Sequence, residues 1–208
     1  MTLRRSSMSP KQSEKFLITQ SLLSSWLYIY KSKNGYEDFL KTLHREHTPP
    51  TKAMLDGNRF EHCLNSVLSG AEIEPTHEWY KPIMELYPIL QSAQQQVALS
   101  KQVTVEGTEF VLYGVLDFLK AGVIYDTKFS KSYRVGKYLN SPQHPMYFAL
   151  VPEAYEFTYL ICDGEYIYKE TYRPDEVEPI ERTIKYFLEF LKNLNLIEIY
   201  KENWRSKY

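Results

Sequence analysis

Two carboxylates and an amine are spaced in this sequence so that a β-hairpin would bring them together. Asp117 comes near the end of one candidate strand, and Asp126 and Lys128 belong to the next. A turn at Ala121-Gly122 would place Asp117 directly opposite Asp126 in an antiparallel pair. Strand side chains alternate between two faces, so Lys128 would share the face of Asp126. Thr127 would point the other way, with its backbone carbonyl close to Asp126.

Such a group could hold a metal ion. Like charges directly opposite each other destabilise paired strands, so Asp117 and Asp126 require a compensating cation. The two carboxylates and the Thr127 carbonyl suit Mg²⁺ or Mn²⁺, which keep several waters, and one water could become a nucleophile beside Lys128. Two alternatives stay open. Strand ends often carry Asp and Lys as ordinary solvated residues, and a three-residue turn would shift the register and turn Asp117 away.

The order of these residues resembles the PD-(D/E)XK nuclease superfamily, in which an acid on one strand precedes an acid-x-Lys triplet on the next. Leu116 stands before the first Asp, where the family name has Pro. Gln143-His144-Pro145-Met146-Tyr147 is similar to the Gln-x-x-x-Tyr element of the RecB-like exonuclease branch, which has phage and CRISPR-adaptation relatives. Gly57–His62 resembles the upstream Gly-to-His element of that branch, and Thr19–Leu27 its opening Ser-rich helix.

The resemblance implies an α/β (α+β) fold with a restriction-endonuclease-like core, in which helices flank a mixed central sheet and the N-terminal region is helical. It implies a Mg²⁺- or Mn²⁺-dependent deoxyribonuclease, an exonuclease that hydrolyses phosphodiester bonds in DNA recombination, repair or phage DNA processing. The implied partner is DNA that is single-stranded or has a free end, and whether a helicase or recombinase partner is needed stays open. Asp117, Asp126 and Lys128 then carry the catalysis.

His62 is a further metal ligand that the resemblance implies. The apolar stripe of its helix lies on nearly the opposite side, which excludes a buried core histidine. Periodicity alone favours a solvated His62, and Glu61 is the alternative ligand. The stripe consists of Phe60, Cys63, Leu64 and Val67.

Gln143 and Tyr147 lie four residues apart, on one face of the helix expected to follow the acid-bearing strands. An amide and a phenol can position phosphate oxygens or hold Lys128 without titrating near neutral pH. The resemblance implies this catalytic role. Ordinary helix packing is the alternative.

A basic segment follows the candidate catalytic lysine directly. Its cations could follow a phosphate backbone while its aromatic rings stack on the bases of a single strand. The alternative is a solvated charged face. The candidate nucleic-acid-binding residues are Lys131, Tyr133, Arg134, Lys137 and Tyr138.

Composition restricts the remaining possibilities. A formal net charge of -1 over 208 residues excludes a uniformly basic nucleic-acid binder. Only Cys63 and Cys162 are present, too few for a disulfide framework or for the four-thiolate iron–sulfur cluster of some CRISPR-adaptation relatives, and consistent with a reducing compartment. We expect the cytoplasm, with the nucleus or an organelle left open. We expect a disordered basic tail over residues 1–15, then a single nuclease-like domain over residues 16–208, with no signal peptide and no membrane span.

Periodicity and turn residues predict the elements in order. Helices are expected near 21–31, 36–44, 52–69 and 78–100, then strands at 103–105, 109–119 and 123–129. A helix at 143–151 and strands at 156–162 and 166–172 follow, and Asp175 would cap a last helix that ends near Leu194.

Two other functions stay open. A DNA-binding or partner-binding module on the same scaffold could have weak catalysis, although intact Asp117, Asp126 and Lys128 argue against that. A metal-dependent hydrolase of another substrate is the second. The sequence has no G-x-x-x-x-G-K-[ST] motif and therefore no recognisable ATP motor.

Overall fold

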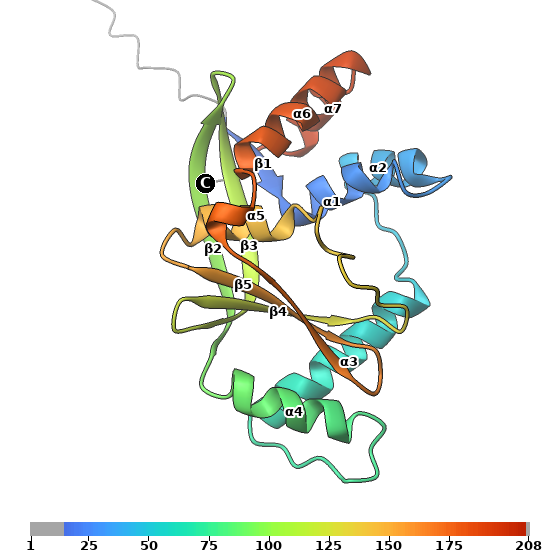
Figure 1. Cartoon of the computed structure of the whole chain (residues 1–208). Helices are drawn as coiled ribbons and strands as arrows, with labels where there is room; N and C mark the ends of the chain where they lie inside the picture. Colours follow the sequence, from blue (N-terminus) through green and yellow to red (C-terminus); the bar gives the residue numbers. More distant parts are fainter. Residues whose placement is uncertain (1–14, 207–208) are drawn as a thin grey trace, which may run out of the picture.

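The long strand β3 organises the computed structural model, which describes residues 15–206. Within that range β3 is central to a six-stranded mixed sheet with helices on both faces (Figure 1), which confirms the predicted fold class. The strands are β1 (Phe16–Thr19), β2 (Gln94–Val105), β3 (Thr108–Lys120), β4 (Val123–Phe129), β5 (Glu156–Cys162) and β6 (Ile167–Tyr172). The helices are α1 (Gln20–Tyr28), α2 (Gly35–Leu43), α3 (Lys52–Leu68), α4 (Tyr80–Leu90), α5 (Gln143–Leu150), α6 (Ile180–Asn193) and α7 (Ile197–Asn203).

Strand β3 has a different arrangement of partners on its two edges. Strand β2 pairs antiparallel along almost the whole of one edge. The other edge is divided, because β1 runs parallel to Phe110–Tyr113 and β4 runs antiparallel to Phe118–Lys120. Residues 114–117 therefore lie between the parts of β3 that pair with β1 and with β4, and we call this stretch the fork. Beyond β4, β5 is parallel and β6 antiparallel to its neighbour.

The register of the β3–β4 hairpin follows from its turn. Ala121 and Gly122 have φ angles of 49° and 79°, the left-handed values that a two-residue type I′ turn needs at both positions. There is a second reason for glycine at position 122, because a Cβ there would lie only 2.9 Å from the Tyr155 ring. Lys120 pairs with Val123 and Phe118 with Tyr125, so the predicted turn and register are confirmed.

Each face of the sheet has its own apolar core. Helices α3 and α4 cover one face, where Phe60 and Leu86 pack with Phe118. Helices α1, α2, α5, α6 and α7 contribute to the core on the other face, which includes Ile124. Tyr125 packs on the α3/α4 core, so the alternation along β4 places Asp126 and Lys128 on the α5 side, as expected.

Three element predictions are wrong or incomplete. The helix expected over 78–100 ends at Leu90, and Gln94 begins β2, because pairing with the long edge of β3 overrides local helix propensity. Asp175 does not cap the last helix, since it lies in a 3₁₀ turn and α6 begins only after Pro179. Strand β1 and helix α7 were not predicted, and the Leu17 N–H of β1 donates a hydrogen bond of 2.6 Å to the carbonyl of Trp204, the residue that follows α7.

The tail predicted for residues 1–15 lies almost entirely outside the described residues. Its last residue, Lys15, accepts a backbone hydrogen bond from Ser206 at 2.8 Å. Along residues 15–206, every helix is too short or too polar to cross a lipid bilayer.

A candidate active site at the strand fork

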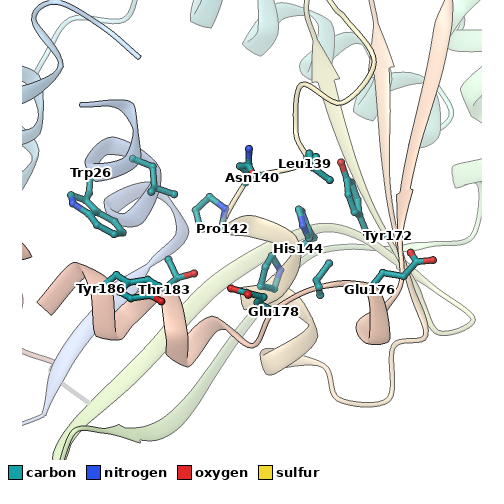
Figure 2. A pocket seen from close by; sticks show the side chains of 14 residues that line it. Trp26, Leu139, Asn140, Pro142, His144, Tyr172, Glu176, Glu178, Thr183 and Tyr186 are labelled. Atoms are coloured by element: carbon teal, nitrogen blue, oxygen red, sulfur yellow. The ribbon is translucent and has the colours of Figure 1, made fainter. Parts of the chain in front are cut away.

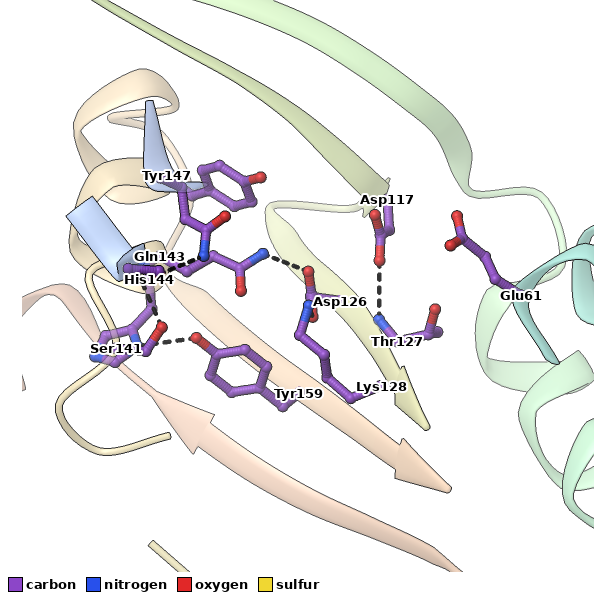
Figure 3. Close-up of polar contacts among 12 residues, drawn as sticks. Glu61, Asp117, Asp126, Thr127, Lys128, Ser141, Gln143, His144, Tyr147 and Tyr159 are labelled. Atoms are coloured by element: carbon purple, nitrogen blue, oxygen red, sulfur yellow. Dashed lines mark hydrogen bonds and ion pairs between the residues drawn. The ribbon is translucent and has the colours of Figure 1, made fainter. Parts of the chain in front are cut away.

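Asp126 is the most buried acid of the site, with 1% of its surface exposed. Its Oδ1 accepts a hydrogen bond of 2.5 Å from Nε2 of Gln143, at the first turn of α5 (Figure 3). Its Oδ2 forms an ion pair with Nζ of Lys128 at 2.6 Å. A buried carboxylate held by one amide and one ammonium is fixed in orientation, which is a requirement for positioning a reactive group.

Asp117 lies where β3 and β4 separate. The pairing ends at Phe118 and Tyr125, and beyond it Oδ2 of Asp117 accepts the backbone N–H of Thr127 at 3.1 Å (Figure 3). The carboxylate thus replaces one bond of the ladder and brings its negative charge close to Asp126. Burial, followed by the charge of Asp126, raises the pKa of Asp117 to about 7, and Glu61 adds to the rise. Lys128 and the Thr127 N–H act in the opposite direction but do not cancel it.

Lys128 remains an ammonium group at the site. Burial alone would lower its pKa, but the charges of Asp126 and Asp117 outweigh burial and raise the pKa above its ordinary value. A lysine in this state cannot act as a general base near neutral pH. It can donate hydrogen bonds to a water molecule or to an anionic oxygen.

Tyr147 connects α5 to the fork. Its hydroxyl donates to the Val115 carbonyl at 2.8 Å, and its ring packs so closely on Gly114 that a Cβ there would lie 2.7 Å from the ring. Burial and then the charge of Asp126 raise the pKa of Tyr147 to about 12, so it stays protonated. These contacts give Tyr147 a packing role that positions Gln143, one turn earlier in α5. Direct contact of Tyr147 with a substrate stays a prediction.

The structure does not bring His62 to the fork. His62 is exposed, and in residues 15–206 its side chain has no described contact with Asp117 or Asp126. Glu61, the alternative ligand, is partly buried, lies near Asp117 (Figure 3) and accepts a hydrogen bond of 3.4 Å from Gln96. Successive residues of an α-helix point about 100° apart around its axis, so Glu61 and His62 face different directions. The geometry therefore favours Glu61 as the third acid in place of His62.

The donor set of the fork fits a hard divalent cation. The carboxylate of Asp117 lies near those of Asp126 and Glu61 and near the ammonium group of Lys128, and burial, then the charges of Asp126 and Glu61, raise its pKa in spite of Lys128. Among residues 15–206, no group of three or more His, Cys, Asp or Glu side chains is placed to hold a metal ion together, so the fork offers an ion no more than two carboxylates as it stands. Mg²⁺ commonly uses one or two protein carboxylates and takes its other ligands from water and substrate phosphate.

No protein-family model matches this chain, and no curated protein matches it. The fold does have relatives among solved structures. It is similar to a structure titled "Crystal structure of SSO0001", with a TM-score of 0.51, 16% identity and coverage of 87% of this chain and 79% of that chain. At this identity the similarity shows the fold alone.

The basic segment forms the loop between β4 and α5. Lys131, Arg134 and Lys137 are exposed there, as a phosphate-binding surface requires. The two tyrosines of the loop are already in contact with other rings. The ring centroids of Tyr133 and Tyr168 are 5.0 Å apart, and those of Tyr138 and Tyr159, which stack, are 4.5 Å apart. Each tyrosine therefore has one face covered by another ring, which fixes the loop on the sheet and leaves at most the other face for a base.

Two residues near the site were not predicted. Gln96, whose backbone is left-handed with a φ of 50°, interrupts the β2–β3 pairing opposite Asp117 and reaches Glu61. His144 is buried, stacks on Tyr172 at 4.1 Å and has a pKa lowered by burial to about 4. The positive φ of Gln96 has no sequence signal. His144 could have been recognised only from the burial of α5 on several sides.

Proposed function

We propose that this chain is a Mg²⁺- or Mn²⁺-dependent deoxyribonuclease that hydrolyses phosphodiester bonds. The observation that carries the proposal is the ion pair of Lys128 with the buried carboxylate of Asp126, beside the half-buried carboxylate of Asp117. Burying charges is costly, and carboxyl groups with a strongly shifted pKa, such as Asp117, are concentrated at functional sites of proteins. An ordinary solvated strand end does not explain an Asp that is 1% exposed.

Asp117, Asp126 and the Thr127 carbonyl would hold the divalent ion, with Glu61 on the side of α3. A bound ion of this kind neutralises phosphate charge and lowers the pKa of a coordinated water. Lys128 donates hydrogen bonds from its ammonium group to the attacking water or to a phosphate oxygen, and so stabilises charge that develops during hydrolysis. Gln143 keeps Asp126 in one orientation through its Oδ1. Tyr147 keeps α5, and with it Gln143, against β3.

Other parts of the proposal are supported by the sequence resemblance. These are action from a DNA end and a role in recombination, repair or phage DNA processing, where a helicase or recombinase could be the partner. The small number of cysteines supports a place in the cytoplasm. His62, if it contributes, must do so from an exposed position.

The test compares linear with closed-circular DNA, both single- and double-stranded, in Mg²⁺, Mn²⁺ or EDTA. The wild-type protein should shorten linear DNA in either metal, leave circles intact and do nothing in EDTA. Asp126→Asn should abolish cleavage, whereas Asp175→Asn, at an exposed acid of the 3₁₀ turn, should have no effect. Cleavage of circles would replace exonuclease by endonuclease. Cleavage by Asp126→Asn at the wild-type rate would contradict the proposed site, and binding without cleavage would indicate a non-catalytic module.

A further inference from the structure

A groove of about 400 Å³ leads away from the candidate active site. Lys128 and Gln143, which both contact Asp126, are among the residues that line it. Helix α1 and the turn after it form one side, and the loop between β4 and α5 forms the other. We call this space the α1 groove. Its position means that a polymer with its reacting phosphate at the fork would have its neighbouring unit in or near this groove.

The charge of the α1 groove favours a polyanion. Lys31, Lys128 and Lys137 line it, and no acidic side chain does. A second cavity of about 340 Å³ adjoins the groove and shares the segment 140–142 with it. Its lining differs in charge, because Glu176 and Glu178 belong to it (Figure 2). Lys128 is paired with Asp126, so Lys31 and Lys137 carry the positive charge that the groove offers to a phosphate, in a chain whose formal net charge is -1.

The walls of the groove also suit a nucleobase. Tyr28 comes from α1 with 51% of its surface exposed, and Tyr138 comes from the loop. Tyr138 is held in place from behind by its stacking on Tyr159, so its orientation is already fixed before any ligand binds. Gln20 and Ser24, joined by a hydrogen bond of 2.8 Å, add polar groups to the α1 wall.

We propose that the α1 groove binds one unpaired nucleotide of a single DNA strand, directly next to the phosphate that is cleaved. Lys31 and Lys137 bind the backbone phosphate, and the rings of Tyr28 and Tyr138 contact the base. A groove of about 400 Å³ is near the lower end of ligand sites, which span about 300–1,000 Å³, and this is the size expected for a single small unit such as one nucleotide. The inference rests on the proposed function and adds a substrate class to it: an unpaired strand.

The test measures binding of a fluorescent oligodeoxythymidylate in EDTA, where no cleavage occurs, and of a blunt DNA hairpin as the duplex probe. Lys31→Gln is compared with Lys33→Gln, and Tyr28→Ala with Tyr30→Ala, because Lys33 and Tyr30 are exposed nearby but do not line the groove. Lys31→Gln should weaken single-strand binding about threefold to tenfold and reduce the salt slope by about 0.7. Tyr28→Ala should weaken it at least about fivefold. The two control variants and the hairpin affinity should change little.

The results separate this inference from the nuclease proposal. If all four variants bind the single strand equally well and the wild-type protein still cleaves linear DNA in Mn²⁺, the proposed binding in the α1 groove is wrong and the nuclease proposal stands. Equal losses in Lys31→Gln and Lys33→Gln would also overturn the groove, since they would indicate only a diffuse positive field. If the wild-type protein neither binds nor cleaves DNA, both the nuclease proposal and the α1-groove proposal are wrong.

Discussion

Asp117→Asn should stabilise the metal-free protein at alkaline pH. The substitution removes one negative charge from the fork and keeps an oxygen that can accept the Thr127 N–H. The pKa of Asp117 is raised from 3.8 to about 7 in the folded protein, chiefly by burial and then by Asp126. A carboxyl group with a raised folded pKa contributes most to stability below its unfolded pKa, and this contribution is lost as the pH rises through the folded value.

The size of the effect follows from the shift. A rise of about 3 pKa units corresponds to at most about 4 kcal/mol at pH 8, at about 1.4 kcal/mol per unit. Asp117 is only half-buried and its neighbours can relax, so we expect about 2 kcal/mol. The advantage of the Asn variant over wild type should be near zero at about pH 4 and grow to this value between about pH 4 and 8.

The assay is urea unfolding in EDTA at several pH values, followed by tryptophan fluorescence. All three tryptophans, Trp26, Trp79 and Trp204, are buried, so their emission reports loss of the core. Asp175→Asn, at an exposed acid, is the matched control and should show no pH-dependent gain. An Asn variant that is no more stable than wild type at pH 8, or whose gain does not change with pH, would refute the raised pKa of Asp117 in the folded protein.

The other variants test separate contacts of the site. Lys128→Met should lower the cleavage rate about 100-fold or more and leave Mn²⁺ binding intact or tighter, as single-turnover kinetics and metal titration would show; an active variant would contradict the role of the ammonium. Glu61→Gln should weaken Mn²⁺ binding measured by calorimetry, whereas His62→Gln should not, and the reverse result would restore His62 as the ligand. Gly114→Ala should lower the free energy of unfolding by about 1–3 kcal/mol, because its Cβ would meet the Tyr147 ring at 2.7 Å; unchanged stability would show that α5 is not tightly held to β3.

The residues on the hairpin were predictable because their positions depend on local rules. A two-residue turn and strand alternation were enough to place Asp117 near Asp126, and Lys128 beside it. The same rules could not show that β3 and β4 separate at Asp117, so that its carboxylate accepts a backbone N–H from β4 instead of standing above the sheet. That detail depends on β1 and β4 sharing one edge of β3.

Residue positions that depend on how the helices pack on the sheet were harder to predict from the sequence. Helical spacing placed Gln143 and Tyr147 on one face, but only the packed structure shows Gln143 on Asp126 and Tyr147 on the fork backbone. Periodicity also separated His62 from the apolar stripe of α3, yet it could not decide whether His62 or Glu61 faces the sheet. Only the end of the strand Gln94–Val105 was predicted, at 103–105, and its first part was missed for a similar reason, since its partner is an edge of β3 that does not exist until the sheet forms.

The central claim is that Asp117 and Asp126 hold a divalent ion at the fork. Its most direct test is an anomalous-scattering map of crystals grown with Mn²⁺ and a short single-stranded oligodeoxynucleotide. We predict a manganese peak within coordination distance of both carboxylates, and its loss in Asp126→Asn. A map of well-ordered wild-type crystals with bound DNA but no peak at these carboxylates, or with the ion held elsewhere, would contradict the claim.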